Sequence, residues 1–380
     1  MMEEVLTAFA HLIRDRRVLT DRRDNQLSEC KARLTFTDGS LLEFSEIWPP
    51  RLTATPTATL TSSGRSTGRC RVARGGDENS RPGYDDPRQA VETCGMVEQM
   101  ASDQLLMRFT GAPMWADNCE DVAFNTLPAA FMPDYRSLRY LTAPNMVVSD
   151  SKNHSPGLQN EGPFLMMNPF RSRCCQHNHS NGRAYYAENL WMATLDNGLA
   201  AVLYTVLTST WKTGDKITLD LPMDIAVRTR NRNKNSVSVN YGPLAYSLKI
   251  DEKFQQENSI KTAIYDSKWK PAADPSKWPS YEIFPTSAWH YGLVLASEPA
   301  QSFTVTRKPG PMSKYPFTPG TAPITLTAKA RKIPSWTIDK YGLCDVLPQS
   351  PVTVNTPTET VTLVPMGAAR LRISVSPGVQ

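Results

Sequence analysis

The sequence predicts a multidomain protein of α and β structure, in which helical hairpins precede one or more β-sandwich domains. Two observations carry this prediction. Between residues 97 and 130, apolar side chains recur at helical spacing on both sides of a short Gly-Pro turn. After residue 199, apolar positions alternate in many short runs separated by Gly and Pro, which is typical of sandwich strands. At 380 residues, the chain can hold two or three domains.

The first 48 residues are expected to form a small helix and a hairpin of unknown role. Apolar residues at helical offsets predict the helix over residues 4–17. Residues 34–36 and 42–44 alternate between apolar and polar side chains around Asp38-Gly39, which is the pattern of a β-hairpin with a two-residue turn. The hairpin could be an interaction module, but a purely structural element that packs against the rest of the protein is the simpler interpretation.

Residues 49–74 differ in character and predict a linker. Thr, Ser, Pro and Arg dominate this stretch, and large apolar side chains are almost absent, so it cannot bury enough surface to fold alone. Its arginines could contact phosphates, although a solvated basic linker is the simpler interpretation.

Residues 75–198 are expected to contain the helices. One helical face carries Val97, Met100, Ala101, Leu105 and Phe109, and Gly111 with Pro113 closes that helix. A second helix is lined by Ala116, Cys119, Ala123, Leu127 and Ala130, with Pro128 able to bend or end it. Prolines predict a loop over residues 132–173. A third helix is expected at residues 185–194, with Asp196-Asn197-Gly198 as its stop.

Residues 199–380 are expected to form the β-sandwich region. Its short apolar runs predict the following strands: 199–207, 217–221, 237–239, 244–248, 291–295, 303–306, 324–328, 361–364 and 371–375. Trp269, Trp278 and Trp289 could stack on sugar rings, but buried anchors between sheets are an equally good interpretation.

The pair Cys174-Cys175 offers the clearest chemical signal. Adjacent cysteines rarely bridge each other, because the small ring strains disulfide geometry. Zinc takes four ligands from Cys, His and acidic side chains, so these two thiols, together with Glu92 and Cys94, would make a metal site if the fold brings the segments together.

Other interpretations of these cysteines stay open. Both could be buried small hydrophobic residues, since free Cys is among the most buried residue types. His177 and His179 provide a second possible ligand set, although no standard zinc-finger spacing accompanies them. The seven cysteines are an odd number, which suits a reduced compartment or a metal better than a set of disulfides. Those elsewhere are expected to be structural or incidental: Cys30, Cys70, Cys119 and Cys344.

Six motifs, in order, resemble those of glycoside hydrolase family 127, the β-L-arabinofuranosidases and relatives once known only as a domain of unknown function. They are Gly75-Gly76-Asp77-Glu78-Asn79, Arg81-Pro82-Gly83-Tyr84, Glu92-Thr93-Cys94-Gly95, Ala123-Phe124-Asn125-Thr126-Leu127-Pro128-Ala129-Ala130, Cys174-Cys175-Gln176-His177-Asn178 and Tyr185-Tyr186-Ala187-Glu188-Asn189-Leu190-Trp191. Further matches are Asn235-Ser236-Val237-Ser238-Val239, Gly242-Pro243-Leu244 and Leu363-Val364-Pro365-Met366-Gly367. The resemblance covers roughly residues 75 to 380.

The resemblance implies a fold and a mechanism. The helical hairpins would be part of an (α/α) toroid. The family is zinc-dependent and replaces the usual carboxylate nucleophile of a retaining glycosidase with a zinc-bound cysteine, for which the matching residue is Cys174. Glu92, Cys94 and Cys175 would complete the metal shell. The matching acid/base is Glu78, which is favoured over its neighbour Asp77; the alternative for Glu78 is an exposed loop carboxylate.

The resemblance also implies about twelve helices, whereas only three are evident after residue 75, so the toroid is expected to be truncated on its N-terminal side. Two functional hypotheses follow. The first is a zinc-dependent retaining glycosidase that acts on β-L-arabinofuranosides or related sugars. The second is a catalytically inactive homologue with a structural zinc site and at most weak carbohydrate binding.

Charge and hydropathy limit the other partners. The 42 Lys and Arg against 37 Asp and Glu give a net charge of +5, too small to indicate a nucleic-acid partner. No stretch is long and apolar enough to predict a membrane span, and the N-terminus lacks the pattern of a secretory signal, so the default expectation is a cytoplasmic protein. The resemblance implies a carbohydrate substrate as its partner. The sequence leaves the oligomeric state open.

Overall fold

The structure is a computed structural model that describes residues 13–23, 28–36, 41–48, 86–154, 162–168, 174–188, 190–193, 199–201, 205–207, 223–257 and 276–380. The chain divides into two compact units, Met1–Ser63 and Gly64–Gln380. The division falls within residues 49–74, the stretch that the sequence predicts as a linker. Among the described helices, none has the combination of length and apolar character that crossing a bilayer requires.

The N-terminal unit contains a three-stranded antiparallel sheet in the order β1-β2-β3. Its strands are β1 (Ile13–Arg23), β2 (Ser28–Phe36) and β3 (Leu41–Trp48). The predicted hairpin is confirmed, because β2 and β3 pair with Leu34 opposite Leu42. Asp38-Gly39, the predicted turn, lies outside the described residues.

The helix predicted over residues 4–17 is wrong from Ile13 onward. Ile13 begins β1 and pairs with Phe36 of β2, and Arg17 pairs with Arg33. An apolar spacing over so short a stretch is a weak signal, and the hydrogen bonds of a sheet ladder outweigh it. Residues 4–12 lie outside the described residues.

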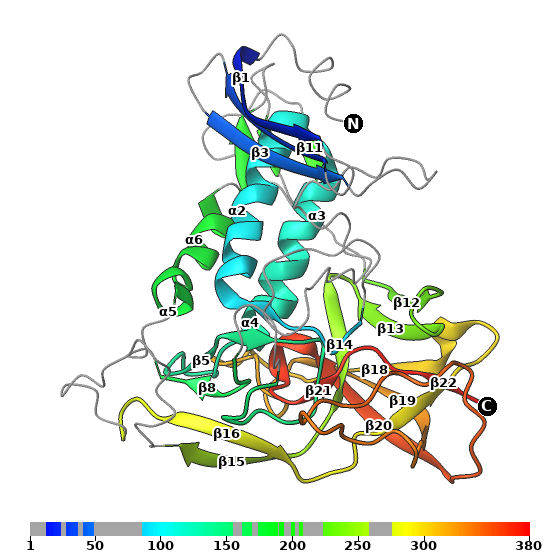
Figure 1. The fold of residues 1–380 in the computed structure, drawn as a ribbon. Helices are drawn as coiled ribbons and strands as arrows, with labels where there is room; N and C mark the ends of the chain where they lie inside the picture. Colours follow the sequence, from blue (N-terminus) through cyan, green and yellow to red (C-terminus); the bar gives the residue numbers. More distant parts are fainter. Residues whose placement is uncertain are drawn as a thin grey trace. The chain divides into compact units, whose positions relative to one another are not determined.

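The C-terminal unit begins with a helical part, as Figure 1 shows. Its helices are α2 (Thr93–Thr110), α3 (Pro113–Asp121), the π-helical turn η3 (Val122–Thr126), α4 (Leu127–Ala129), α5 (Cys174–Asn178) and α6 (Asn181–Glu188). The first two predicted helices are confirmed. Gly111 ends α2 in the left-handed conformation, with a φ of 63°, and its N–H donates to the carbonyl of Met107.

The helical part has its own apolar core. Val97 and Met100 of α2 and Leu127 of α4 are buried in it. Gly182 of α6 lies against all three: a Cβ at this position would be 3.0 Å from side-chain atoms of Leu127 and Met100. Glycine therefore lets α6 lie close against α2 (Figure 1).

The third predicted helix is shifted. It was expected at residues 185–194, but α6 ends at Glu188 and Trp191–Ala193 forms strand β9. β9 pairs with β10 (Leu199–Ala201), which pairs with β11 (Thr205–Leu207), so the single strand predicted over 199–207 is two strands. Asn197-Gly198, interpreted as a helix stop, is a residue pair that hairpin turns favour, and it separates β9 from β10 in the sequence.

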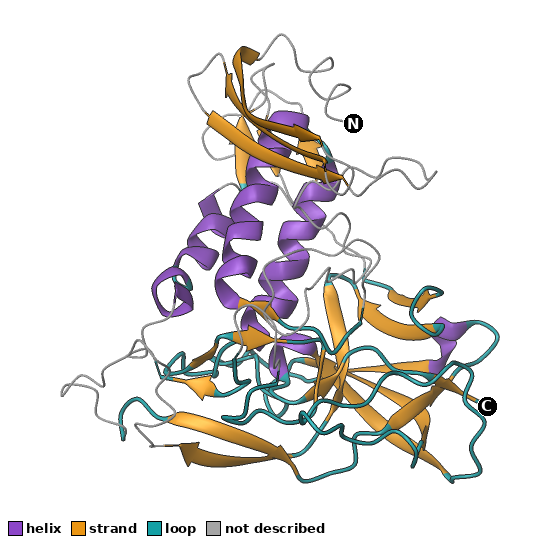
Figure 2. Cartoon of the chain, viewed as in Figure 1, coloured by secondary structure: helices purple, strands orange, loops and turns teal. Residues whose placement is uncertain are grey.

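Most of the rest of the unit is β structure, shown in orange in Figure 2. The main sheet has the order β12-β13-β14-β20-β19-β17-β22. Its strands are β12 (Ile225–Arg230), β13 (Ser236–Tyr241), β14 (Leu244–Lys249), β17 (Tyr291–Val294), β19 (Ile324–Lys332), β20 (Thr358–Pro365) and β22 (Gly378–Val379). β18 (Phe303–Arg307) pairs with β19, and β21 (Arg372–Ile373) joins β14 to β7 (Asn145–Met146). The predicted strands after residue 223 are confirmed, whereas residues 217–221 lie outside the described residues.

A second sheet has the order β15-β16-β8-β5. These strands are β15 (Glu252–Glu257), β16 (Ser280–Pro285), β8 (Met166–Met167) and β5 (Leu138–Arg139). Met166 belongs to the core of the β part and Met167 to the core of the helical part, so alternate side chains of β8 serve both.

Of the predicted tryptophans that are described, Trp289 favours the structural interpretation, whereas Trp278 is half-buried. Trp289 is buried in the core of the β part, and its ring meets that of Trp336 edge to face, with 5.3 Å between centroids. Trp269 lies outside the described residues.

Three hydrogen bonds hold Asn125, in the π-helical turn, and two of them cross to the main sheet. Its amide nitrogen donates to the carbonyl of Pro243 at 2.9 Å and to Asp121, while its amide oxygen accepts the N–H of Ala245 at 2.7 Å. The side chain is buried. The helical motif containing Asn125 is thereby fixed to the β13–β14 turn.

We predict that Asn125→Ala lowers the free energy of unfolding by about 2 kcal/mol, because it removes a buried side chain that makes three hydrogen bonds, two of them to the main sheet. Denaturant titration followed by circular dichroism measures the change. The control is Ser102→Ala, which removes an exposed hydroxyl that bonds within its own helix and should change stability by less than about 0.5 kcal/mol. Equal effects of the two substitutions would contradict the account.

Candidate metal centre

Two separate segments form the centre. Glu92 ends strand β4 (Val91–Glu92) and Cys94 lies in the first turn of α2, while Cys174 and Cys175 begin α5. β4 pairs with β6 (Leu141–Thr142), so Glu92 lies opposite Leu141.

Thr93 anchors the start of α2 beside these ligands. Its N–H donates to the carbonyl of Tyr140 at 3.0 Å, and its hydroxyl donates to the carbonyl of Arg139 at 2.7 Å. Thr93 is fully buried. Glu92 and Cys94 therefore flank a residue whose position is fixed by two hydrogen bonds, so their side chains project from a well-anchored backbone.

The structure brings the four predicted ligands together. One donor atom from each of Glu92, Cys94, Cys174 and Cys175 lies within 4.8 Å of the other three. The Cys94 and Cys174 sulfurs are 3.3 Å apart, and Glu92 Oε2 is 3.0 Å from Cys94 Sγ and 3.9 Å from Cys174 Sγ. The N–H of Cys94 points at the Cys175 sulfur, at 3.3 Å.

This donor set fits a tetrahedral metal ion. With Zn–S bonds of about 2.3 Å, tetrahedral sulfurs are about 3.8 Å apart, and a carboxylate oxygen is slightly closer to each sulfur. The two oxygen–sulfur separations, 3.0 and 3.9 Å, bracket the expected value, while the 3.3 Å between the Cys94 and Cys174 sulfurs is shorter than the tetrahedral one. Thiolates and one carboxylate are also ligands that zinc accepts, so the residues present could hold such an ion.

Burial distinguishes the three thiols. Cys175 is fully buried and Cys94 is partly buried, whereas Cys174 is exposed. Contact with Cys175 lowers the pKa of the Cys174 thiol to about 6. Contacts with Cys174 and Cys94, together with burial, raise the pKa of Cys175. The sulfur that solvent can reach is therefore also the one that most readily becomes a thiolate in the metal-free site.

Tyr140 supports the carboxylate from behind. Its hydroxyl donates a hydrogen bond to Glu92 Oε1, while Glu92 Oε2 faces the sulfurs of Cys94 and Cys174. The Tyr140 side chain is buried. The hydrogen bond leaves one carboxylate oxygen for a metal and fixes its direction.

No pattern in the sequence pointed to Tyr140. It lies in a stretch predicted as a loop, and only the pairing of β4 with β6 brings it to Glu92. Predicting this contact would have required knowing that β4 and β6, each only two residues long, pair with each other.

The other predicted residues have different positions. His179 Nδ1 lies 2.9 Å from the Gln176 carbonyl and its ring packs on Phe131, and neither His177 nor His179 belongs to the metal-ligand group found among the described residues. Cys119 is buried in the core between helices, as predicted. Glu78 and Asp77 lie outside the described residues.

We predict that Tyr140→Phe lowers the affinity of the site for zinc by about 10- to 100-fold, because the carboxylate loses the hydrogen bond that orients it. Competition with a chromogenic chelator measures this affinity without any assay of activity. Tyr185→Phe, which removes a hydroxyl from α6, is the matched control and should bind zinc like the unmodified protein. An unchanged affinity in Tyr140→Phe would show that the hydroxyl does not orient the ligand.

Comparisons with known proteins agree with this geometry. Residues 63–188 match the family model described as the β-L-arabinofuranosidase, GH127 catalytic domain, a range that contains all four ligands. A search of curated proteins found no match to the chain.

Three solved structures resemble this chain at low sequence identity. One titled "Glycoside hydrolase" has a TM-score of 0.50 and 14% identity, and the match covers 84% of this chain and 60% of that one. A GH127 β-arabinofuranosidase has a TM-score of 0.43 and 12% identity, with coverage of 77% and 50%. A GH127 β-L-arabinofuranosidase from Geobacillus stearothermophilus T6 has a TM-score of 0.30 and 10% identity, with coverage of 78% and 50%.

The first of these structures carries the likeness of fold, and this chain spans 60% of its length. The chain is therefore similar to the GH127 catalytic domain over residues 63–188, and similar to this structure in its mixed helix and strand fold.

Proposed function

We propose that this chain is a zinc-dependent retaining glycoside hydrolase that acts on β-L-arabinofuranosides or related sugars, with Cys174 as its nucleophile. The observation that carries the proposal is the convergence of three thiols and one carboxylate within 4.8 Å, with Cys174 the exposed member. The match of residues 63–188 to the catalytic-domain model of β-L-arabinofuranosidases supports the substrate class.

The proposal includes an architecture. Residues 75–198 would be part of an (α/α) toroid and residues 199–380 a β-sandwich region, after a segment of unknown role over 1–48 and a linker over 49–74. The helical hairpin of α2 and α3 and the main sheet support this division.

Glu92, Cys94, Cys174 and Cys175 would hold the zinc ion. Zinc, when bound, favours the thiolate form of its cysteine ligands over the thiol. The protein itself supplies the direction of these ligands, because Tyr140 holds Glu92 and the Cys94 N–H holds the Cys175 sulfur.

In the first proposed step, the Cys174 sulfur attacks the anomeric carbon. A carbon–sulfur bond forms as the glycosidic carbon–oxygen bond breaks, and Glu78 donates its proton to the departing oxygen. In the second step, Glu78 takes a proton from water, whose oxygen attacks the same carbon and releases the Cys174 sulfur. Two displacements at one carbon retain its configuration.

The test is turnover of a chromogenic β-L-arabinofuranoside. We expect hydrolysis by the unmodified protein, complete loss in Cys174→Ser, and a loss of roughly 100-fold or more in Glu78→Gln. For a substrate whose leaving group departs readily without protonation, Glu78→Gln should reduce the rate of hydrolysis less, because that departure needs less acid assistance. Cys119→Ala removes a thiol from the core between helices and should leave the chemistry intact.

Elemental analysis of the same samples separates the outcomes. About one zinc ion per chain with turnover is the expected result. Zinc without turnover would instead support the catalytically inactive homologue with a structural zinc site. A folded protein without zinc would contradict both.

A further inference from the structure

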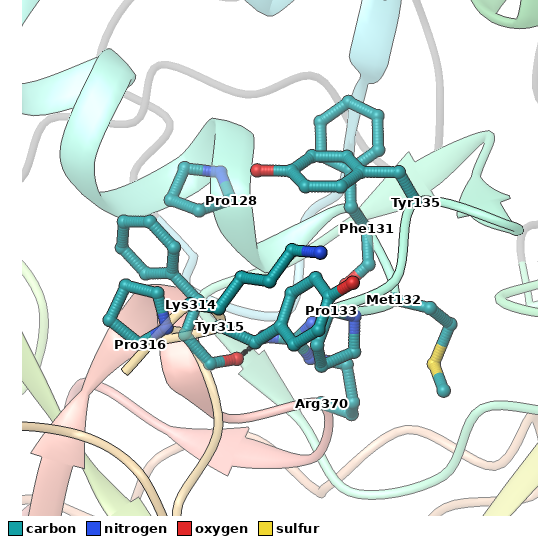
Figure 3. Close-up of a pocket in the computed structure, with 10 residues that line it drawn as sticks. Pro128, Phe131, Met132, Pro133, Tyr135, Lys314, Tyr315, Pro316 and Arg370 are labelled. Carbon is teal, nitrogen blue, oxygen red and sulfur yellow. Dashed lines mark hydrogen bonds between the residues drawn. The ribbon is translucent and has the colours of Figure 1, made fainter. Parts of the chain in front are cut away.

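A pocket lies beside the metal-bearing helical segment and is not used by the chemistry above. Figure 3 shows it. It contains about 360 Å³ of empty space, a figure that includes space open to solvent. The lining residues that matter here are four aromatic and two cationic ones: Phe131, Tyr135, Tyr315, Phe317, Lys314 and Arg370.

The aromatic rings at the mouth are accessible. Tyr135 is 53% exposed and Tyr315 is 40% exposed, which is unusual for such large side chains. Tyr135 also has a φ of 58°, in the left-handed region that residues other than Gly, Asn and Asp seldom occupy. Its N–H donates to the carbonyl of Met132 at 2.9 Å, and its ring lies 5.6 Å from that of Phe131. A tight turn therefore presents this ring to solvent at a cost in backbone strain.

The floor and the rim are positively charged. Arg370 is 3% exposed and donates to the backbone carbonyls of Phe131, Gly367 and Phe317. Burial lowers its pKa to about 10, so it stays charged at neutral pH. The Lys314 ammonium lies 5.4 Å from the centroid of the Tyr315 ring, and in the view of Figure 3 it lies between the rings of Tyr135 and Tyr315.

No acidic side chain in the described part of the chain forms an ion pair with Lys314 or Arg370. Among the residues that line the pocket, Lys314 and Arg370 are cationic and none carries a carboxylate. The lining is therefore positively charged, and a pocket of this kind attracts anions.

The pocket is connected to the metal centre through α5 and α6. The Phe131 ring lies 5.8 Å from the ring of His179, whose N–H donates to the carbonyl of Cys175. Arg183 of α6 lies over the Phe317 ring at 5.7 Å. Two pocket walls therefore contact the helical segment that begins with Cys174.

We propose that this pocket is a carbohydrate subsite that binds a uronate ring, a sugar unit that carries a carboxylate. The exposed tyrosine rings offer apolar faces for the C–H face of a sugar, while their hydroxyls and Lys314 offer polar contacts at its edge. The carboxylate of the uronate supplies the negative charge that the cationic pocket lacks. A neutral sugar would stack equally well but would offer no carboxylate to the Lys314 ammonium.

The role of the pocket in catalysis rests on the proposed function, because it would hold an acidic unit of the same substrate whose arabinofuranoside bond is cleaved. Binding itself does not depend on turnover. The two ideas can therefore fail separately.

The test is isothermal titration calorimetry on the full chain, with oligogalacturonate and a neutral galactose oligomer of equal length as probes. We expect the uronate oligomer to bind about tenfold more tightly than the neutral one at low ionic strength, with a difference that shrinks as salt screens the charges. Lys314→Gln should remove most of this preference, and Tyr315→Ala should weaken binding of both oligomers.

The chain offers a matched control in Lys340 and Tyr341, an exposed Lys-Tyr pair with the same cation–ring contact at 4.9 Å but outside the pocket. Lys340→Gln and Tyr341→Ala should leave both affinities unchanged. Equal binding of the two oligomers, or identical effects of the pocket and control variants, would overturn the proposal. Absence of arabinofuranoside turnover alongside selective uronate binding would reject the proposed function and keep the subsite.

Discussion

The approach of the first turn of α2 to the first turn of α5 is the constraint on which the rest of the structure depends. It places three sulfurs and a carboxylate within 4.8 Å of one another, although the two segments are about eighty residues apart in the sequence. Several ionised donors at such distances repel each other unless a cation lies among them. A metal ion would thus tie two distant segments together, so that binding free energy becomes folding free energy.

The contacts around this centre keep the segments in place. Thr93 fixes the start of α2 against the backbone of residues 139–140, and Tyr140 fixes the carboxylate. In the π-helical turn η3, Asn125 holds the helical part to the main sheet. Gly367 lets the end of the main sheet lie close to α4, because a Cβ at this position would lie 2.7 Å from the Pro128 side chain. Segments that are far apart in the sequence therefore contact each other in the folded chain.

Much of the fold was predictable from local patterns. Apolar periodicity with Gly111 and Pro113 located the α2–α3 hairpin, and alternation located the described strands of the main sheet. Glu92, Cys94, Cys174 and Cys175 were identified from residue chemistry and motif resemblance. Short apolar stretches misled: residues 13–17 and 191–194 have helical spacing, but those of them that are described form strands because sheet partners are available. Tyr140 and the aromatic pocket were not predictable, since each is created by tertiary contacts between segments that show no pattern of their own.

The most direct test of the central claim is X-ray absorption at the zinc K-edge of the zinc-loaded protein. We predict a first shell of three sulfurs at about 2.3 Å and one oxygen at about 2.0 Å, as the three cysteines and Glu92 require. Cys174→Ser should reduce the sulfur contribution by one atom. A shell made only of nitrogen and oxygen, or a sulfur contribution that Cys174→Ser leaves unchanged, would contradict the account.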